Sequence, residues 1–156
     1  MKKIMIVDDN YLSAEGIEKN IDWETLNAEI IHVCYNGTSA IEAMKKEPAD
    51  LIISDIEMPD LDGISMSRQA LDINPMVKII LISAYDKFEY ARRALLLGAL
   101  DYIEKPLDYA YLIQKVKNAF ALMEKEQKNL QLLKQSRPLL TEKFFREITH
   151  LPSSEA

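Results

Sequence analysis

Acidic residues stand directly after two short apolar runs in this chain. Asp8 and Asp9 follow residues 4–7, and Asp55 follows residues 51–54. If the two runs are neighbouring parallel strands, their carboxyl ends meet at one edge of the sheet and the three carboxylates converge. A small set of hard oxygen ligands suits Mg²⁺, so the spacing predicts a magnesium site there. Aspartate is also common in loops after strands, so these acids alone do not establish a metal site.

Two further polar residues are expected at the same edge. Ser83 follows the apolar run 77–82, and Lys105 comes soon after the run 100–103. A hydroxyl and an ammonium group at strand ends can both contact phosphate oxygens, the lysine as a point charge. Phosphoryl transfer needs mainly positioning and charge neutralisation, and a carboxylate can take up the group as an acyl phosphate. We therefore predict that one of these carboxylates is the nucleophile, with Ser83 and Lys105 on the phosphate.

The elements that must position these residues alternate between strand and helix. Five-fold alternation favours a parallel sheet with helices on both faces and right-handed crossovers. The expected strands are 3–7, 29–33, 51–54, 77–82 and 100–103. The expected helices are 12–20, 64–73, 86–97 and a long one from Leu107 to about Gln135, together with one that follows the turn Asn36-Gly37. Thr38 is expected to cap the helix after that turn, and Gly98 to end the helix 86–97. A cis Lys105–Pro106 bond would aim the lysine side chain inward, although only about 5% of such bonds are cis.

Length and composition exclude several classes of protein. The 156 residues suit one domain with an appendage, and the apolar share of 48% can bury a core. The net charge of −6 argues against a nucleic-acid surface formed by these residues. Cys34 is the only cysteine, so an internal disulfide is excluded and no zinc cluster is indicated. The first apolar stretch ends at Asp8, too short for a signal peptide, and no run is long enough for a membrane span, so we expect a cytoplasmic protein.

Four segments carry a resemblance to a known family. They are IMIVDDN (4–10), DLIISDIEMPDLDG (50–63), ILISAY (80–85) and GALDYIEKP (98–106). In order and spacing they resemble the receiver domain of two-component response regulators, over residues 1 to about 123. The resemblance implies an α/β flavodoxin-like (βα)5 fold, a doubly wound parallel sheet of strand order 2-1-3-4-5 with an extended C-terminal helix. It also implies a receiver domain at 1–123 and a helical linker at 124–156 that leads toward an output domain.

The same resemblance assigns roles to single residues. It implies that a sensor histidine kinase phosphorylates Asp55, and that phosphorylation changes the surface formed by helix 86–97, the fifth strand and the last helix. The chain is then a phosphoacceptor that assists its own phosphotransfer and dephosphorylation, and not an enzyme. The implied ligands of Mg²⁺ are Asp8, Asp9, Asp55 and the backbone carbonyl of Glu57; the implied switch residues are Ser83 and Tyr102; and Lys105 binds a phosphate oxygen.

A narrower likeness concerns the output domain. The segments IDW (21–23), SAYDKFEYA (83–91) and LLTEKFF (139–145) resemble regulators whose output is an AraC-type helix-turn-helix domain. We therefore expect a transcription regulator whose DNA-binding domain lies outside these residues. DNA contact is expected only through that domain, and no membrane contact is expected.

The C-terminal region leaves alternatives open. Val116, Met123 and Leu130 stand seven apart, a weak heptad signal that suggests a homodimer through the last helix and the linker. Residues 140, 144, 148 and 151 form another apolar stripe, and either stripe can instead pack on its own domain. Two other functions compete with the switch. An aspartate-nucleophile phosphohydrolase needs a cap domain for which the chain lacks room, and a phosphorylation-independent dimerisation module remains the alternative.

Overall fold

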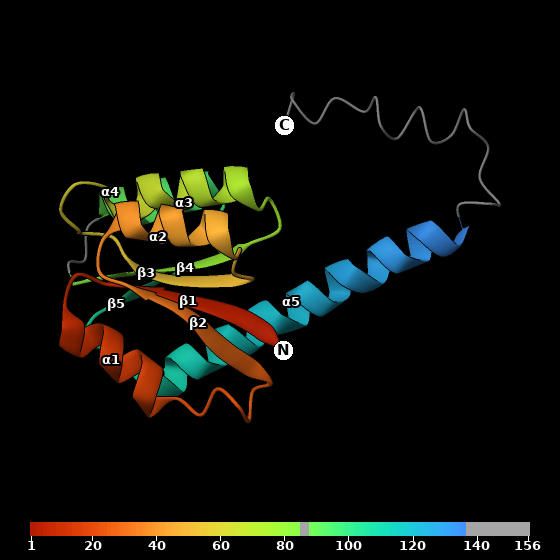
Figure 1. Cartoon of the computed structure of the whole chain (residues 1–156), viewed down its shortest axis with the longest axis horizontal. Coiled ribbons are helices and arrows are strands. Elements are labelled where there is room, and N and C mark those ends of the chain that lie inside the picture. The colour runs from red at the N-terminus through yellow and green to blue at the C-terminus, as the bar shows by residue number, and fades with distance from the viewer. Residues whose placement is uncertain (85–87, 137–156) are drawn as a thin grey trace. The chain divides into compact units, whose positions relative to one another are not determined.

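Five parallel strands form one sheet in this computed structural model, which describes residues 1–84 and 88–136 (Figure 1). The strand order β2-β1-β3-β4-β5 confirms the expected doubly wound topology. Each strand is short; the three central strands are mostly buried, as expected for parallel strands covered on both faces, whereas the two edge strands are mostly half-buried. The strands are β1 (Lys2–Val7), β2 (Ala28–Cys34), β3 (Leu51–Asp55), β4 (Lys78–Ser83) and β5 (Asp101–Glu104).

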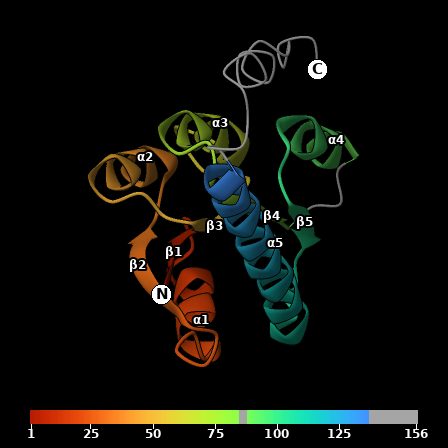
Figure 2. The ribbon, with the colours of Figure 1, turned by 90° about the vertical axis from the view of Figure 1, so that its right-hand side faces the viewer.

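Helices cover both faces of the sheet (Figures 1 and 2). On one face lie α2 (Gly37–Lys46), α3 (Gly63–Ile73) and α4 (Phe88–Leu97); on the other lie α1 (Tyr11–Asn20) and the first turns of α5 (Tyr109–Ser136). Successive strand side chains point to opposite faces, so every strand supplies both layers. The layer beneath α2 and α3 takes its apolar side chains from alternate strand positions, including Met5, Val7, Ile52, Ile79 and Leu81.

Helix starts are set by side-chain caps, and two of them correct the sequence-based prediction. Asn36, and not Thr38, caps α2, because its side-chain oxygen accepts a hydrogen bond from the Ser39 N–H at 2.7 Å. Asp108 does the same for α5, accepting from the Ala110 N–H at 3.0 Å, so this helix begins at Tyr109 instead of Leu107. The cap of α2 thus lies two residues before the predicted cap, and α5 begins two residues after its predicted start.

Strand ends and connections differ from the prediction only locally. Strands β4 and β5 each lie one residue further along than predicted, because their hydrogen-bonded ladder runs from Ile80–Asp101 to Ser83–Glu104. Gly98 ends α4 with a φ of 89°, as predicted for a left-handed cap. The Lys105–Pro106 bond is cis, the form that the sequence raised at odds of only about one in twenty. The predicted start of the fourth helix at 86 and the apolar stripe at 140–151 lie outside the described residues.

The chain divides into two units, Met1–Phe120 and Ala121–Ala156. The first contains the whole sheet and residues 109–120 of α5, where Leu112, Val116 and Ala119 are fully buried. Val116, the first member of the heptad row, is therefore a core residue, whereas Leu130 in the second unit is 50% exposed. Within 1–84 and 88–136, no helix combines the length and apolar character that crossing a membrane requires.

Candidate functional site

Three carboxylates converge at the carboxyl edge of the sheet. Asp8 follows β1 and Asp55 ends β3, and these strands are hydrogen-bonded neighbours. Together with Asp9 they offer carboxylate oxygens that all lie within 4.8 Å of one another. Asp8 and Asp55 are buried, whereas Asp9 is exposed. The strand order thus brings together acids that are 46 or more positions apart in the sequence, as the sequence predicted.

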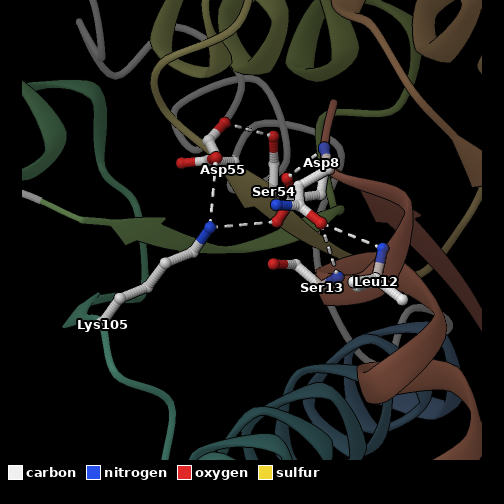
Figure 3. A network of polar contacts seen from close by, with 7 residues as sticks. Asp8, Leu12, Ser13, Ser54, Asp55 and Lys105 are labelled. Carbon is white, nitrogen blue, oxygen red and sulfur yellow. Dashed lines mark hydrogen bonds and ion pairs between the residues drawn. The ribbon is translucent and has the colours of Figure 1, made fainter.

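Lys105 directly follows the carboxyl end of β5, and its side chain reaches this cluster. Its Nζ lies 3.2 Å from Asp8 Oδ2 and 3.4 Å from Asp55 Oδ2, so one ammonium group bridges two buried carboxylates (Figure 3). Burial alone lowers the pKa of Lys105, but the attraction of Asp55 and Asp8 outweighs it and the net pKa is raised. The lysine therefore stays charged and partly neutralises the site.

The phosphoacceptor candidate has an altered pKa. Burial, and then repulsion by the Asp8 charge, raise the pKa of Asp55 from 3.8 to about 6, although Lys105 opposes the rise. The carboxylate is thus held in a position that disfavours its charge. A cation placed among the three acids, or a covalent group on the Asp55 carboxylate, would remove this electrostatic penalty. Perturbed pKa values of this kind are typical of functional sites.

The turn after β1 is built around Asp8 and Asn10. Asp8 Oδ1 accepts a hydrogen bond from the Asn10 N–H at 2.9 Å. The Asn10 side-chain oxygen caps α1, accepting from the N–H groups of Leu12 and Ser13 at 3.0 and 3.1 Å. Figure 3 labels Leu12 and Ser13 beside Asp8. Asn10 therefore acts on the site indirectly, by holding the turn that carries Asp8. Sequence reasoning missed this role, although an Asn just before a helix is a recognised cap signal.

The other predicted residues surround the cluster at different depths. Ser83 is the last residue of β4 and is fully buried, and its carbonyl accepts the Lys105 N–H at 2.8 Å. Tyr102 lies two positions before Glu104 on β5 and packs, half-buried, against the core beneath α4. Glu57 lies two residues beyond Asp55, and its carboxylate is not part of the acidic cluster found among the described residues. The predicted roles of these three residues stay predictions.

The loop between β3 and α3 is packed tightly at two glycines. A Cβ added to Gly63 would lie 2.1 Å from the carbonyl oxygen of Asp55, and one added to Gly37 would lie 2.5 Å from that of Leu61. Both distances are far below van der Waals contact, so each position requires glycine for close backbone approach. The segment that follows Asp55 is thereby held at two points.

The donor set fits a small, hard cation. It consists of carboxylate oxygens from Asp8, Asp9 and Asp55, and Mg²⁺ prefers oxygen ligands of this kind. Two of these acids are buried beside a single lysine, so the cluster carries excess negative charge. The described residues place no imidazole or thiolate in the cluster, which excludes the ligand chemistry typical of a structural zinc site there.

Comparisons with known proteins agree with this architecture. A family model for the response regulator receiver domain matches residues 4–117. The uncharacterized transcriptional regulatory protein YesN of Bacillus subtilis (strain 168) is 29% identical over 126 residues, which cover 81% of this chain and 34% of YesN. The transcriptional regulatory protein HptR of Staphylococcus aureus (strain NCTC 8325 / PS 47) is 32% identical over 114 residues, which cover 72% of this chain and 44% of HptR. The chain therefore spans less than half the length of these relatives.

Solved structures show the same similarity. The REC domain of AraT, a response regulator from Geobacillus stearothermophilus, matches with a TM-score of 0.76 and 33% identity, covering 81% of this chain and 98% of that one. A two component transcriptional regulator AraC from Clostridium phytofermentans ISDg matches with a TM-score of 0.73 and 30% identity, covering 83% of this chain and 99% of that one.

Proposed function

The chain belongs to the response regulator receiver domain family, and from this premise we propose that it is a signalling switch that accepts a phosphoryl group on Asp55. The observation that carries the proposal is the convergence of Asp8, Asp9 and Asp55 with Lys105 at one edge of the sheet. Asp55 is buried at the end of β3, which lies between β1 and β4 in the sheet. Its carboxylate faces the lysine that can hold a phosphate oxygen.

The chain's own residues supply the positioning for the transfer. An oxygen of the Asp55 carboxylate attacks phosphorus, the bond from phosphorus to the donor breaks, and the electron pair of that bond leaves with the donor. The phosphoryl group then forms a mixed anhydride with Asp55. Lys105 binds a phosphoryl oxygen, and the hydroxyl of Ser83 can bind another. Asp8, Asp9, Asp55 and the Glu57 backbone carbonyl would hold Mg²⁺, which would supply positive charge for the transferring oxygens.

We propose that the physiological donor is the phosphohistidine of a sensor histidine kinase. The phosphoryl group adds about −1.5 to −2 charge and three acceptor oxygens where a buried carboxylate stood. New bonds from Ser83 and Lys105 bias the region of α4, β5 and α5 between two states, with Tyr102 moving in concert. The chain is a phosphoacceptor and not a general phosphatase.

The output of the switch is proposed from the relatives. YesN and HptR are named transcriptional regulatory proteins, and the chain covers 34% and 44% of them. Because a two component transcriptional regulator AraC is among the similar solved structures, we infer that the switch controls a DNA-binding domain of the AraC type that lies outside these residues. Homodimerisation through α5 and the linker is part of the same proposal. The net charge of −6 supports a regulatory rather than a DNA-contacting role for this part.

Phosphorylation of the purified chain tests the site directly. We expect incubation with Mg²⁺ and acetyl phosphate to add one phosphoryl group, measured by intact mass, and EDTA to prevent it. Asp55→Asn removes the nucleophile and is expected to stay unlabelled. Asp60→Asn is the matched control, because the same change falls on an exposed residue of the next loop whose φ of 69° asparagine tolerates.

Two outcomes would contradict the proposal. A folded wild-type chain that gains no mass with Mg²⁺ and donor excludes the switch, and full labelling of Asp55→Asn excludes the assigned residue. Mass is preferred over tryptophan fluorescence for a structural reason. Trp23 is buried just before β2, and its carbonyl accepts the N–H of Ala28, the first residue of that strand. Asp55 is the last residue of β3. Because the strands are parallel, Trp23 lies at their amino ends and Asp55 at their carboxyl ends.

A further inference from the structure

We propose that Ser54 is a positioning residue for the phosphoacceptor. Its hydroxyl holds the main-chain carbonyl of Asp55, and thereby the direction in which the Asp55 carboxylate leaves the end of β3. The inference rests on the proposed function of Asp55. It adds a residue whose hydroxyl touches neither the carboxylate oxygens of the acidic cluster nor the phosphate.

The contact lies inside the core. Ser54 is fully buried, and its Oγ donates a hydrogen bond to the Asp55 carbonyl oxygen at 2.8 Å (Figure 3). Successive strand residues point to opposite faces, so the Ser54 side chain lies on the α3 side while the Asp55 carboxylate lies on the other. The hydroxyl therefore reaches around the strand end to the backbone of its neighbour without entering the acidic cluster.

This carbonyl belongs to the peptide at which the strand stops. The N–H of the same peptide, that of Ile56, donates to the Ile82 carbonyl at 2.9 Å. Both polar groups of the Asp55–Ile56 peptide are thus bonded, one to β4 and one to Ser54. Because a peptide is planar, fixing its two ends fixes its rotation, and this rotation sets where Asp55 points. Removing the hydroxyl releases one end and leaves the other.

Close packing prevents water from taking over the role of the hydroxyl. Gly63 begins α3 directly against this peptide: a Cβ on Gly63 would lie 2.1 Å from the Asp55 oxygen and 3.0 Å from the Ile56 Cα. The Gly63 N–H also donates to the Ile56 carbonyl at 2.8 Å. A water molecule has no room on that side. A buried acceptor that loses its donor pays a desolvation cost, so the peptide is expected to rotate toward another partner.

Such a rotation affects transfer more than folding. The carboxylate of Asp55 must lie close to Asp8, Asp9 and the Lys105 ammonium, which is 3.4 Å away. Transfer rates depend steeply on alignment, and a misplacement of about 1 Å can cost about 100-fold. Since the Ile56 N–H bond to β4 remains, we expect a smaller loss, about 5- to 10-fold in rate.

The test compares four chains by intact mass at saturating Mg²⁺ and acetyl phosphate. Ser54→Ala removes the hydroxyl and is expected to be slowed about 5- to 10-fold, whereas Ser54→Thr restores it and is expected to stay within about 2-fold of wild type. Ser67→Ala is the matched control. Ser67 is also fully buried and its hydroxyl donates to a backbone carbonyl, that of Gly63 at 2.6 Å, but within one helix. The Ser67→Ala variant is expected to have a lower free energy of unfolding but the same maximal rate of phosphorylation as wild type.

Each outcome decides the proposal. Equal rates for Ser54→Ala and wild type overturn it, as do equally slow Ala and Thr variants, because the hydroxyl is then not the cause. Slowing of Ser67→Ala to the same degree also overturns it, because the effect then reflects general loosening. If Ser54→Ala does not fold, Ser54→Cys, a weaker donor of similar size, replaces it under the same criteria. Failure of wild type to be labelled concerns the proposed function instead.

Discussion

Asp55 carries a charge that its surroundings disfavour. Burial and the charge of Asp8 raise its pKa to about 6, against the opposing effect of Lys105. The folded chain therefore binds a proton at Asp55 more tightly than the unfolded chain, whose carboxyl has its ordinary pKa of 3.8. The stabilising contribution of the neutral form is complete below that ordinary pKa. It is lost as the pH rises through about 6, so ionised Asp55 destabilises the metal-free fold at neutral pH.

Replacing this carboxyl by an amide should therefore stabilise the metal-free protein. One pKa unit corresponds to about 1.4 kcal/mol, and solvent screening reduces the full value, so we expect Asp55→Asn to gain about 1–2 kcal/mol at about pH 7.5 in EDTA. The gain should shrink steadily as the pH is lowered toward about 4. Urea unfolding of both chains across this range measures the difference. A gain that is absent or independent of pH, or one that Asp60→Asn reproduces, contradicts the assigned cause.

At the scale of elements, caps and close packing set where the loops at the site begin. Asn36 and Asp62 start α2 and α3 by accepting the N–H groups of Ser39 and Ser65, each at 2.7 Å. Gly37 directly follows the first cap and allows the Leu61 carbonyl to approach. The pair Asn36-Gly37, interpreted from sequence as a turn, is thus a helix start packed against the loop that follows Asp55.

The correction from Thr38 to Asn36 as the cap of α2 can be measured. Asn36→Ala leaves the Ser39 N–H without its acceptor, so we expect a loss of about 1 kcal/mol in the free energy of unfolding. Thr38→Ala lies within the first turn of α2, is exposed, and is expected to change stability by less than about 0.5 kcal/mol. Urea unfolding with unchanged denaturant dependence gives both values. A larger loss for Thr38→Ala would restore the original assignment.

At the scale of the whole molecule, the site and its supporting core lie in one unit. Met1–Phe120 contains the five strands, the acidic cluster and the buried residues of α5 up to Phe120. The predicted boundary at 123 and the linker 124–156 stay predictions. Val116, the first residue of the heptad row, is buried in the core of this unit and is not available to a partner. The proposed dimer contact therefore concerns the residues after this unit.

A chain that ends at Phe120 separates these roles. Because every group of the site lies within Met1–Phe120, we expect cooperative unfolding and labelling by acetyl phosphate within about 2-fold of the full chain. If the tail carries dimerisation, light scattering should show a dimer of the full chain with Mg²⁺ and beryllofluoride, and a monomer of the shortened one. A shortened chain that folds but is not labelled contradicts the assignment of the site to this unit. A dimer of both contradicts the role of the tail.

Much of this protein follows from local patterns alone. Short apolar runs predicted the five strands, because a buried parallel strand needs apolar side chains on both faces. For four of them, the Asp, Ser or Lys at or just after the end of the run predicted which polar residues stand at the strand ends. The alternation with amphipathic helices predicted the doubly wound sheet, and the order and spacing of the motifs predicted the family. These features depend on neighbours within a few positions or on the order of elements along the chain.

Tertiary structure decided what depends on distant groups meeting. Only the β2-β1-β3-β4-β5 order places Lys105 between Asp8 and Asp55, and the pKa of Asp55 follows from burial and charges contributed by other strands. The choice between Asn36 and Thr38 as cap, and the bond from Ser54 to the Asp55 carbonyl, likewise required the path of the backbone. Sequence determined which chemical groups stand at the strand ends, whereas packing determined their distances and protonation, since both depend on atoms that lie far apart in the chain.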